Sequence, residues 1–104
     1  MNINAQDDVK QQAIQLYEAN EWEKLEELLQ QHEAELQADP DFYLLSARVQ
    51  TYHLHLDDSE AWLRRGVNQF PDNIPLKQGL AVILELKRQL SPDQRKERSE
   101  FDYD

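Results

Sequence analysis

The stretch of residues 38–62 constrains the fold most, because its apolar spacing predicts one helix, a break and the start of another. Asp39 can accept a hydrogen bond from the free backbone N–H groups of a helix start, and Pro40 suits the first helical position. Five large apolar residues follow at steps of three or four, on one side of a helix: Phe42, Leu45, Val49, Tyr52 and Leu56. We therefore predict a helix over residues 39–56, and a second helix that is capped by the acidic pair before Ser59.

The same helix carries a second, weaker apolar stripe beside the first. Its members are Leu44, Ala47, Thr51 and Leu54. A helix with two apolar sides is typically buried between two neighbours. We therefore place the helix over residues 39–56 at the centre of the domain.

The segments on either side repeat the plan of a cap, an amphipathic helix and a short break. Their apolar spacing predicts helices over residues 5–19, 22–36, 59–69 and 73–90. Asn20 is expected to end the first helix and to cap the second, and Asn73 or Asp72 to cap the last. The prediction is an all-α fold of antiparallel helical hairpins, with five main helices in a domain that spans residues 1–90. Residues 91–104 are expected to form either a charged tail or a short capping helix.

Gly66 stands in the middle of the predicted helix over residues 59–69. A glycine at such a position costs about 1 kcal/mol relative to alanine, because the backbone loses more freedom when it becomes helical. We expect the offset to be the close approach of another helix at Gly66, where a side chain would not fit.

The composition bounds the class of protein. A chain of 104 residues forms one domain that is large enough for a single core, and the absence of cysteine excludes a disulfide framework and a thiol nucleophile. The N-terminal residues show no basic region followed by an apolar run, and no apolar stretch approaches the length of a membrane span. We therefore expect a cytoplasmic protein without a membrane partner.

The net charge of −10 is concentrated in the first half of the chain. Residues 1–47 carry 11 acidic and 2 basic residues, whereas residues 48–104 carry 10 acidic and 9 basic residues. A solvated acidic face that aids solubility is the simplest interpretation. The alternative is an electrostatic surface that steers a basic partner to the N-terminal half. Nucleic-acid binding is disfavoured in either case, because phosphate contacts need a basic surface.

No pattern in the chain indicates catalysis or a bound cofactor. There is no glycine-rich phosphate loop and no set of cysteine and histidine residues at metal-ligand spacing. His53 and His55 are two residues apart, so on a helix their side chains would diverge and would not share one metal ion. The many carboxylates lie on predicted helix faces, without the cleft that a general acid or base needs. We predict a protein that is not an enzyme and that holds no metal ion and no cofactor.

The predicted units also repeat along the chain. Pro40 and Pro71 each close one helix–turn–helix unit and lie 31 residues apart, and residues 20–25 (NEWEKL) place an aromatic residue directly after a turn. Together with the Glu-Ala pair at residues 60–61, these features make residues 5–90 resemble a degenerate tetratricopeptide array, a family with a 34-residue period. The resemblance implies a short right-handed array of two hairpins and a further helix. The spacing departs from the family's pattern, because the first hairpin is long and the second unit is about three residues short.

In tetratricopeptide-like proteins, the first helix of each hairpin lines a groove that binds a peptide or helix of a partner. The resemblance places ten residues in that groove: Lys10, Ile14, Tyr17, Leu44, Ala47, Thr51, Leu54, Gln78, Val82 and Leu86. The set lacks the Lys/Asn/Arg cluster with which chaperone-binding members hold a C-terminal carboxylate. The predicted ligand is therefore an apolar or amphipathic helical segment of another protein.

Four alternatives stay open from the sequence. The weaker stripes could close the core of a compact helical bundle in place of a groove. The acidic half could belong to an inhibitor or immunity-type protein that blocks a basic surface. The chain could be the N-terminal helical region of a larger enzyme, such as a transferase. A second copy of the chain, in a homodimer, could also cover the apolar surface that includes Val82 and Leu86.

Overall fold

The computed structural model describes residues 5–90, and all regular secondary structure in this part of the chain is helical. Six helices follow one another along it: α1 (Ala5–Glu18), α2 (Trp22–Gln31), α3 (Glu33–Leu36), α4 (Pro40–Tyr52), α5 (Leu56–Gln69) and α6 (Ile74–Gln89). The predicted all-α class is confirmed, whereas both alternatives for residues 91–104 lie outside the described residues. Among these six helices, none has the length and apolar character needed to cross a membrane.

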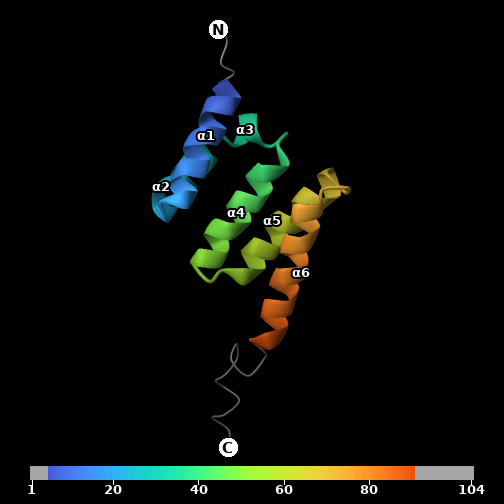
Figure 1. The fold of residues 1–104 in the computed structure, drawn as a ribbon. Coiled ribbons are helices and arrows are strands. Elements are labelled where there is room, and N and C mark those ends of the chain that lie inside the picture. The colour runs from blue at the N-terminus through green and yellow to red at the C-terminus, as the bar shows by residue number, and fades with distance from the viewer. Residues whose placement is uncertain (1–4, 91–104) are drawn as a thin grey trace, which may run out of the picture.

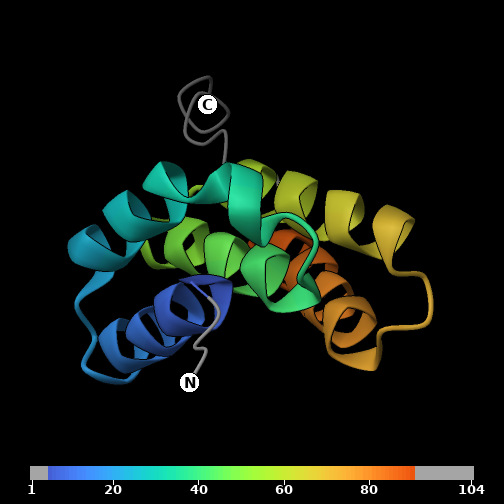
Figure 2. The ribbon, with the colours of Figure 1, turned by 90° about the horizontal axis from the view of Figure 1, so that it is seen from above.

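Neighbouring helices pair as antiparallel hairpins, α1 with α2 and α4 with α5, and α6 runs back along α5 (Figure 1). Seen from above, the helices form two layers, with α2, α3 and α5 in one and α1, α4 and α6 in the other (Figure 2). Helix α4 lies between α1 and α6, and it packs against α2, α5 and α6. The predicted position of this helix at the centre of the domain is confirmed.

The helix starts repeat at one constant interval. Helix α2 begins at Trp22 and α5 at Leu56, and α4 begins at Pro40 and α6 at Ile74. The step from Trp22 to Leu56 equals the step from Pro40 to Ile74, and the second of these, which is the length of the second unit, is 34 residues. The expectation that the second unit is about three residues short is wrong.

The caps before α4 and α6 explain this error. The Asp39 carboxylate accepts a hydrogen bond from the Asp41 N–H at 2.9 Å, and the Asn73 side-chain oxygen accepts one from the Leu76 N–H at 3.0 Å. Both predicted caps are therefore confirmed, and they occupy equivalent positions. Pro71 precedes its cap, whereas Pro40 follows Asp39 directly, so a spacing measured between the two prolines underestimates the repeat.

The turns that follow α1 and α4 share one geometry. Asn20 and Leu54, which are separated by the same interval as the helix starts, both have left-handed backbone conformations, with φ of 61° and 64°. In each turn this residue donates its N–H to the carbonyl three residues back, and the next residue donates to the carbonyl five residues back. This pattern is the Schellman motif that ends helices. Asn20 thus ends α1 as predicted, but the N-cap residue of α2 is Glu21, which makes no side-chain capping bond.

Helix α4 ends at Tyr52 and not at Leu56, so the predicted helix over residues 39–56 is too long. The apolar spacing continues across the turn, and Leu56 is the first residue of α5. The acidic pair Asp57 and Asp58 does not cap this helix but lies in its first turn, where the helix dipole favours negative charge. A Schellman turn with leucine in place of glycine carries no sequence signal, which accounts for the error.

Replacing Leu54 with glycine is expected to stabilise the fold. Leu54 is 76% exposed and holds a left-handed conformation that costs a residue with a Cβ about 1–2 kcal/mol. Glycine removes this cost, but it also raises the conformational entropy of the unfolded chain. The free energy of unfolding should therefore rise by up to about 1 kcal/mol. Urea denaturation measures it. Leu54→Ala removes the same exposed side chain but keeps the Cβ, and it should show no gain; an equal gain in both variants would contradict the explanation.

The predicted helix over residues 22–36 is divided at His32. The backbone leaves helical geometry there (φ −116°, ψ 22°), and the His32 ring nitrogen Nδ1 lies 2.5 Å from Glu35 Oε1. The short helix α3 that follows brings Leu36 into the core, where it is 2% exposed. The Gln37 carbonyl then accepts a hydrogen bond from the buried Tyr43 hydroxyl at 2.9 Å. The break thus lets the chain turn over the start of α4.

One continuous core joins the two layers. Its buried apolar residues are Val9, Ala13, Leu25, Leu29, Leu36, Phe42, Tyr43, Leu45, Ala47, Val49, Leu63, Leu76 and Ile83. The main α4 stripe is confirmed at Phe42, Leu45 and Val49, but Tyr52 is 55% exposed. Gly66 is buried where α4, α5 and α6 meet, as predicted: a Cβ there would lie 2.8 Å from Tyr43 Cβ.

Candidate protein-interaction groove

A groove of about 580 Å³ runs between α4 and α6, with α5 behind it. The buried residues Ser59 and Leu63 of α5 form its floor, and Trp22 of α2 borders it on the other side of α4. The full set of lining residues is Trp22, Leu44, Ala47, Arg48, Thr51, Tyr52, Ser59, Leu63, Pro75, Gln78, Gly79, Val82 and Ile83. Its volume falls within the range of about 300–1,000 Å³ that is typical of ligand sites.

The lining is mainly apolar, and within residues 5–90 it contains a single charged side chain, Arg48. No carboxylate from this part of the chain lines it, although the sequence has 21 acidic residues. Val82 on the α6 wall is 63% exposed and belongs to the lining. Burial of an apolar surface of this kind by a ligand is favourable, because it removes the surface from water.

The polar groups on the floor satisfy one another. The hydroxyls of Thr51 and Ser59 lie 2.8 Å apart, and each lies 3.0 Å from the Ala47 carbonyl oxygen. This cluster links the last turn of α4 to the first turn of α5. Because its hydrogen bonds are made within the protein, an apolar ligand can cover the floor without stranding a polar group.

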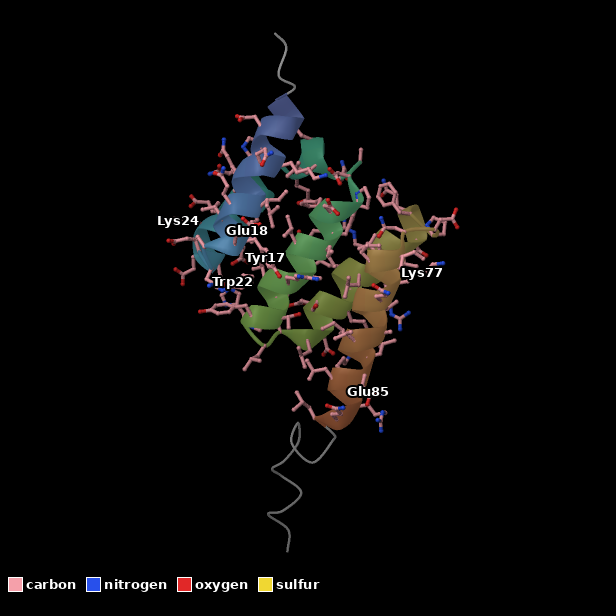
Figure 3. All side chains as sticks on the ribbon, viewed as in Figure 1. Tyr17, Glu18, Trp22, Lys24, Lys77 and Glu85 are labelled. Atoms are coloured by element: carbon pink, nitrogen blue, oxygen red, sulfur yellow. The ribbon has the colours of Figure 1, made fainter. Side chains whose placement is uncertain are left out.

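Aromatic side chains form the edge of the groove that faces α1 and α2. Trp22 stacks on Tyr52 with ring centroids 4.8 Å apart, and Tyr17 meets Trp22 edge to face at 5.5 Å. Tyr17 and Trp22 lie next to each other beside α4 (Figure 3). The Arg48 guanidinium stands over the Tyr17 ring, 5.4 Å from its centroid, and donates a hydrogen bond from Nη1 to the Tyr17 hydroxyl. The aromatic edge thus holds the guanidinium of Arg48 in place.

Ion pairs outside the groove attach the α6 wall to α5. Lys87 Nζ lies 2.6 Å from Asp57 Oδ1 and 2.6 Å from Glu60 Oε1. The hydrogen bonds that Lys87 donates, first to Asp57 and then to Glu60, raise the pKa of Lys87. The hydrogen bond from Lys87, followed by that from Arg64, lowers the pKa of Glu60. These ion pairs therefore stabilise the packing of α6 against α5.

The ten residues predicted for the groove fall into two sets. Five of them line it: Leu44, Ala47, Thr51, Gln78 and Val82. Five do not: Lys10, Ile14, Tyr17, Leu54 and Leu86.

The members of the second set have other environments. Lys10 forms ion pairs with Asp39 at 3.0 Å and Asp41 at 3.1 Å, so it links α1 to the start of α4. Tyr17 contacts two residues of the lining, Trp22 and Arg48, but does not line the groove itself. The helical placement of Leu54 is wrong, because this residue belongs to the turn after α4. The partly buried residues Ile14 and Leu86 lie outside the lining.

Sequence reasoning missed eight of the lining residues. It assigned Tyr52 to the core stripe of its helix, and it left the second helices of the hairpins out of the groove. The second helices α2 and α5 contribute Trp22, Ser59 and Leu63. Arg48 was missed because it falls outside both stripes of α4. Its signal was that it is the one basic residue of that helix.

The two histidines after α4 do not diverge as predicted. His53 and His55 lie in the turn and not on a helix, and their ring centroids are 5.8 Å apart. His53 Nε2 lies 3.5 Å from Glu26 Oε1, and His55 Nδ1 lies 3.2 Å from Gln50 Oε1. Within residues 5–90, no three histidine, aspartate or glutamate side chains are grouped so that they could hold a metal ion.

Comparison of the chain with models of protein families, with curated proteins and with solved structures finds no match.

Proposed function

We propose that this chain is a non-enzymatic interaction module, and that its groove binds an apolar or amphipathic helical segment of another protein. The observation that carries the proposal is an apolar groove of about 580 Å³ whose floor hydroxyls are already hydrogen-bonded. Burial of apolar side chains against such a surface is favourable, and the hydroxyl groups of the floor need no hydrogen bond from the ligand. A helix that lays one apolar face into a groove between helices is a common mode of recognition.

The tetratricopeptide-like arrangement remains part of this proposal. Helix starts, caps and left-handed turn residues that recur at one shared interval support it, because that interval matches the family's period of about 34 residues. The position of α1, α4 and α6 in one layer supports it as well, since the first helices of the hairpins line the groove in the family. Two hairpin units and a further helix then give a short array with one binding groove.

A fluorescence titration tests the proposal. The probe is a synthetic amphipathic peptide with leucines three and four residues apart, added to the full chain with Trp62 replaced by phenylalanine. Trp22 lines the groove and then reports on it alone. We expect a saturable change with an affinity in the micromolar range, where the gain from apolar burial exceeds the cost of ordering the peptide. A peptide of the same composition with the leucine spacing scrambled is the control, and equal binding of both peptides would contradict the proposal.

A second copy of the chain is the competing occupant of the groove. Light scattering on the full chain without peptide is expected to report a monomer, because the proposal reserves the groove for another protein. A dimer that dissociates when Val82 is changed to glutamate would instead assign the groove to self-association. The exposed position of Val82 in the lining makes this variant a direct reporter of what covers the groove.

A further inference from the structure

We infer that the helix bound in this groove presents a carboxylate to Arg48, on the side of the ligand that faces α1. The inference rests on the proposed function and specifies the chemistry of the partner. The occupant of the groove is an amphipathic helix of another protein, with an acidic residue at the border of its apolar face.

The charge of Arg48 has no partner of opposite sign within residues 5–90. Arg48 is exposed and, among residues 5–90, it is the single charged residue in the lining and makes no ion pair with any carboxylate. Of the other basic residues in this range, Lys77 also makes no ion pair, but it lies outside the lining. Other basic residues in the described part, such as Lys10 and Lys87, have two carboxylate partners each. Arg48 thus remains available for a carboxylate from outside.

The Arg48 side chain is already oriented by its contact with Tyr17. Its guanidinium stands over the Tyr17 ring and donates one hydrogen bond to the Tyr17 hydroxyl. This contact uses one of the five N–H donors of the group, and the remaining donors suit the two oxygens of a carboxylate. A side chain that is held in position loses less entropy on binding than a mobile one. Tyr17 therefore acts as a positioning residue.

A ligand that covers Arg48 must compensate for the loss of water around its charge. A ligand helix that fills the apolar groove also removes water from Arg48, which belongs to the α4 wall together with Ala47 and Thr51. Burial of an unpaired charge is costly, whereas a hydrogen-bonded partner offsets the loss of water. A neutral ligand would bear this cost without compensation. A basic group at the same place would add repulsion.

The arrangement of the lining sets the register of the ligand. Arg48 stands near Trp22 and Tyr52 at the α1 edge, while Val82 belongs to the α6 wall. The apolar anchors of the ligand should therefore face Leu63 and Val82, and the acidic residue should flank them on the α1 side. A carboxylate elsewhere on the ligand finds no other cation in the lining that residues 5–90 form, and it meets a chain of net charge −10. The groove therefore selects for a single acidic group at one position.

Three peptides test the inference on the full chain. They share one amphipathic sequence and differ only at the flanking position, which holds Glu, Gln or Lys, and each carries a fluorescent label for anisotropy. We expect the Glu peptide to bind about threefold to tenfold more tightly than the Gln peptide, and the Lys peptide to bind more weakly than both. In Arg48→Gln the three affinities should converge, and in Arg48→Glu the Lys peptide should become the tightest. Tyr17→Phe should reduce the preference in part.

The outcomes separate the inference from the proposed function. If the Gln and Glu peptides bind the natural chain equally, the inference is overturned while the groove proposal stands. If none of the three peptides binds, the groove proposal fails and the inference with it. Circular dichroism confirms that the Arg48 variants are folded, and a preference that survives in folded Arg48→Gln would also overturn the inference. The preference should shrink as salt is raised, since it arises from a charge at an exposed edge.

Discussion

Replacing Val82 with glutamate is expected to abolish peptide binding while the helical fold persists. Val82 is 63% exposed on α6, so water can solvate the new carboxylate in the absence of ligand. A bound helix would cover that carboxylate in an apolar groove, where an unpaired charge costs several kcal/mol, and the affinity should fall by about 100-fold or more. Fluorescence anisotropy measures the binding, and circular dichroism with thermal melting measures the fold.

Leu54→Glu is the matched control for this variant. Leu54 is also a large, exposed apolar residue, but it belongs to the turn after α4 and not to the groove lining. The same change in chemistry should therefore leave the affinity within about twofold of the natural chain. If Val82→Glu unfolds the protein, its side chain belongs to the core and the groove is closed in solution. If both glutamate variants bind peptide normally, the ligand uses another surface.

Replacing Gly66 with alanine is expected to destabilise the protein by about 1–3 kcal/mol. The new methyl group would lie 2.8 Å from Tyr43 Cβ and 3.0 Å from Leu76 Cδ1, so α4, α5 and α6 must move apart. Tyr43 cannot yield easily, because it is 2% exposed and its hydroxyl donates toward the Gln37 carbonyl and Gln69 Oε1, both at 2.9 Å. The higher helix propensity of alanine, worth about 1 kcal/mol, offsets only part of this clash. Urea denaturation gives the difference in the free energy of unfolding.

Gly79→Ala provides the comparison within the same helix packing. A Cβ at Gly79 would meet the flexible ends of two leucines, Leu63 Cδ2 at 3.1 Å and Leu44 Cδ1 at 3.4 Å. Side-chain ends can shift by a few tenths of an ångström more cheaply than the Cβ of Tyr43. The propensity gain should therefore cancel most of the strain, and the change should be smaller than for Gly66→Ala. A neutral or stabilising effect of Gly66→Ala would show that the three helices are not in close contact at this point.

The starts of α4 and α6 could be predicted from the sequence because local chemistry determines them. Asp39 and Asn73 satisfy backbone N–H groups that no helix can satisfy by itself, and Pro40 has the backbone angle that a first helical turn requires. These effects act within three or four residues and do not depend on the rest of the chain. For the same reason, the apolar faces of the helices and most of the buried residues followed from spacing alone.

The ends of the helices could not be predicted in the same way. At Leu54 the chain adopts a left-handed turn without glycine, and at His32 it breaks without glycine or proline. Neither position differs in local propensity from a helix interior. Packing of α5 on α4 and burial of Leu36 outweigh the local preference at these points, and both contacts join segments that become neighbours only in the folded chain.

The sequence by itself determined the helical class, the caps of α4 and α6 and the close approach at Gly66, because each depends on residue types at short range. Tertiary structure alone decided which side chains share the groove. Arg48 lies beside Tyr17, 31 residues away, only because α1 lies beside α4, and the α5 floor meets the α6 wall only because α6 packs against α5. Helical spacing describes the faces of one helix at a time. A groove between helices depends on how those faces are turned toward one another, and the packing of the whole core sets that orientation.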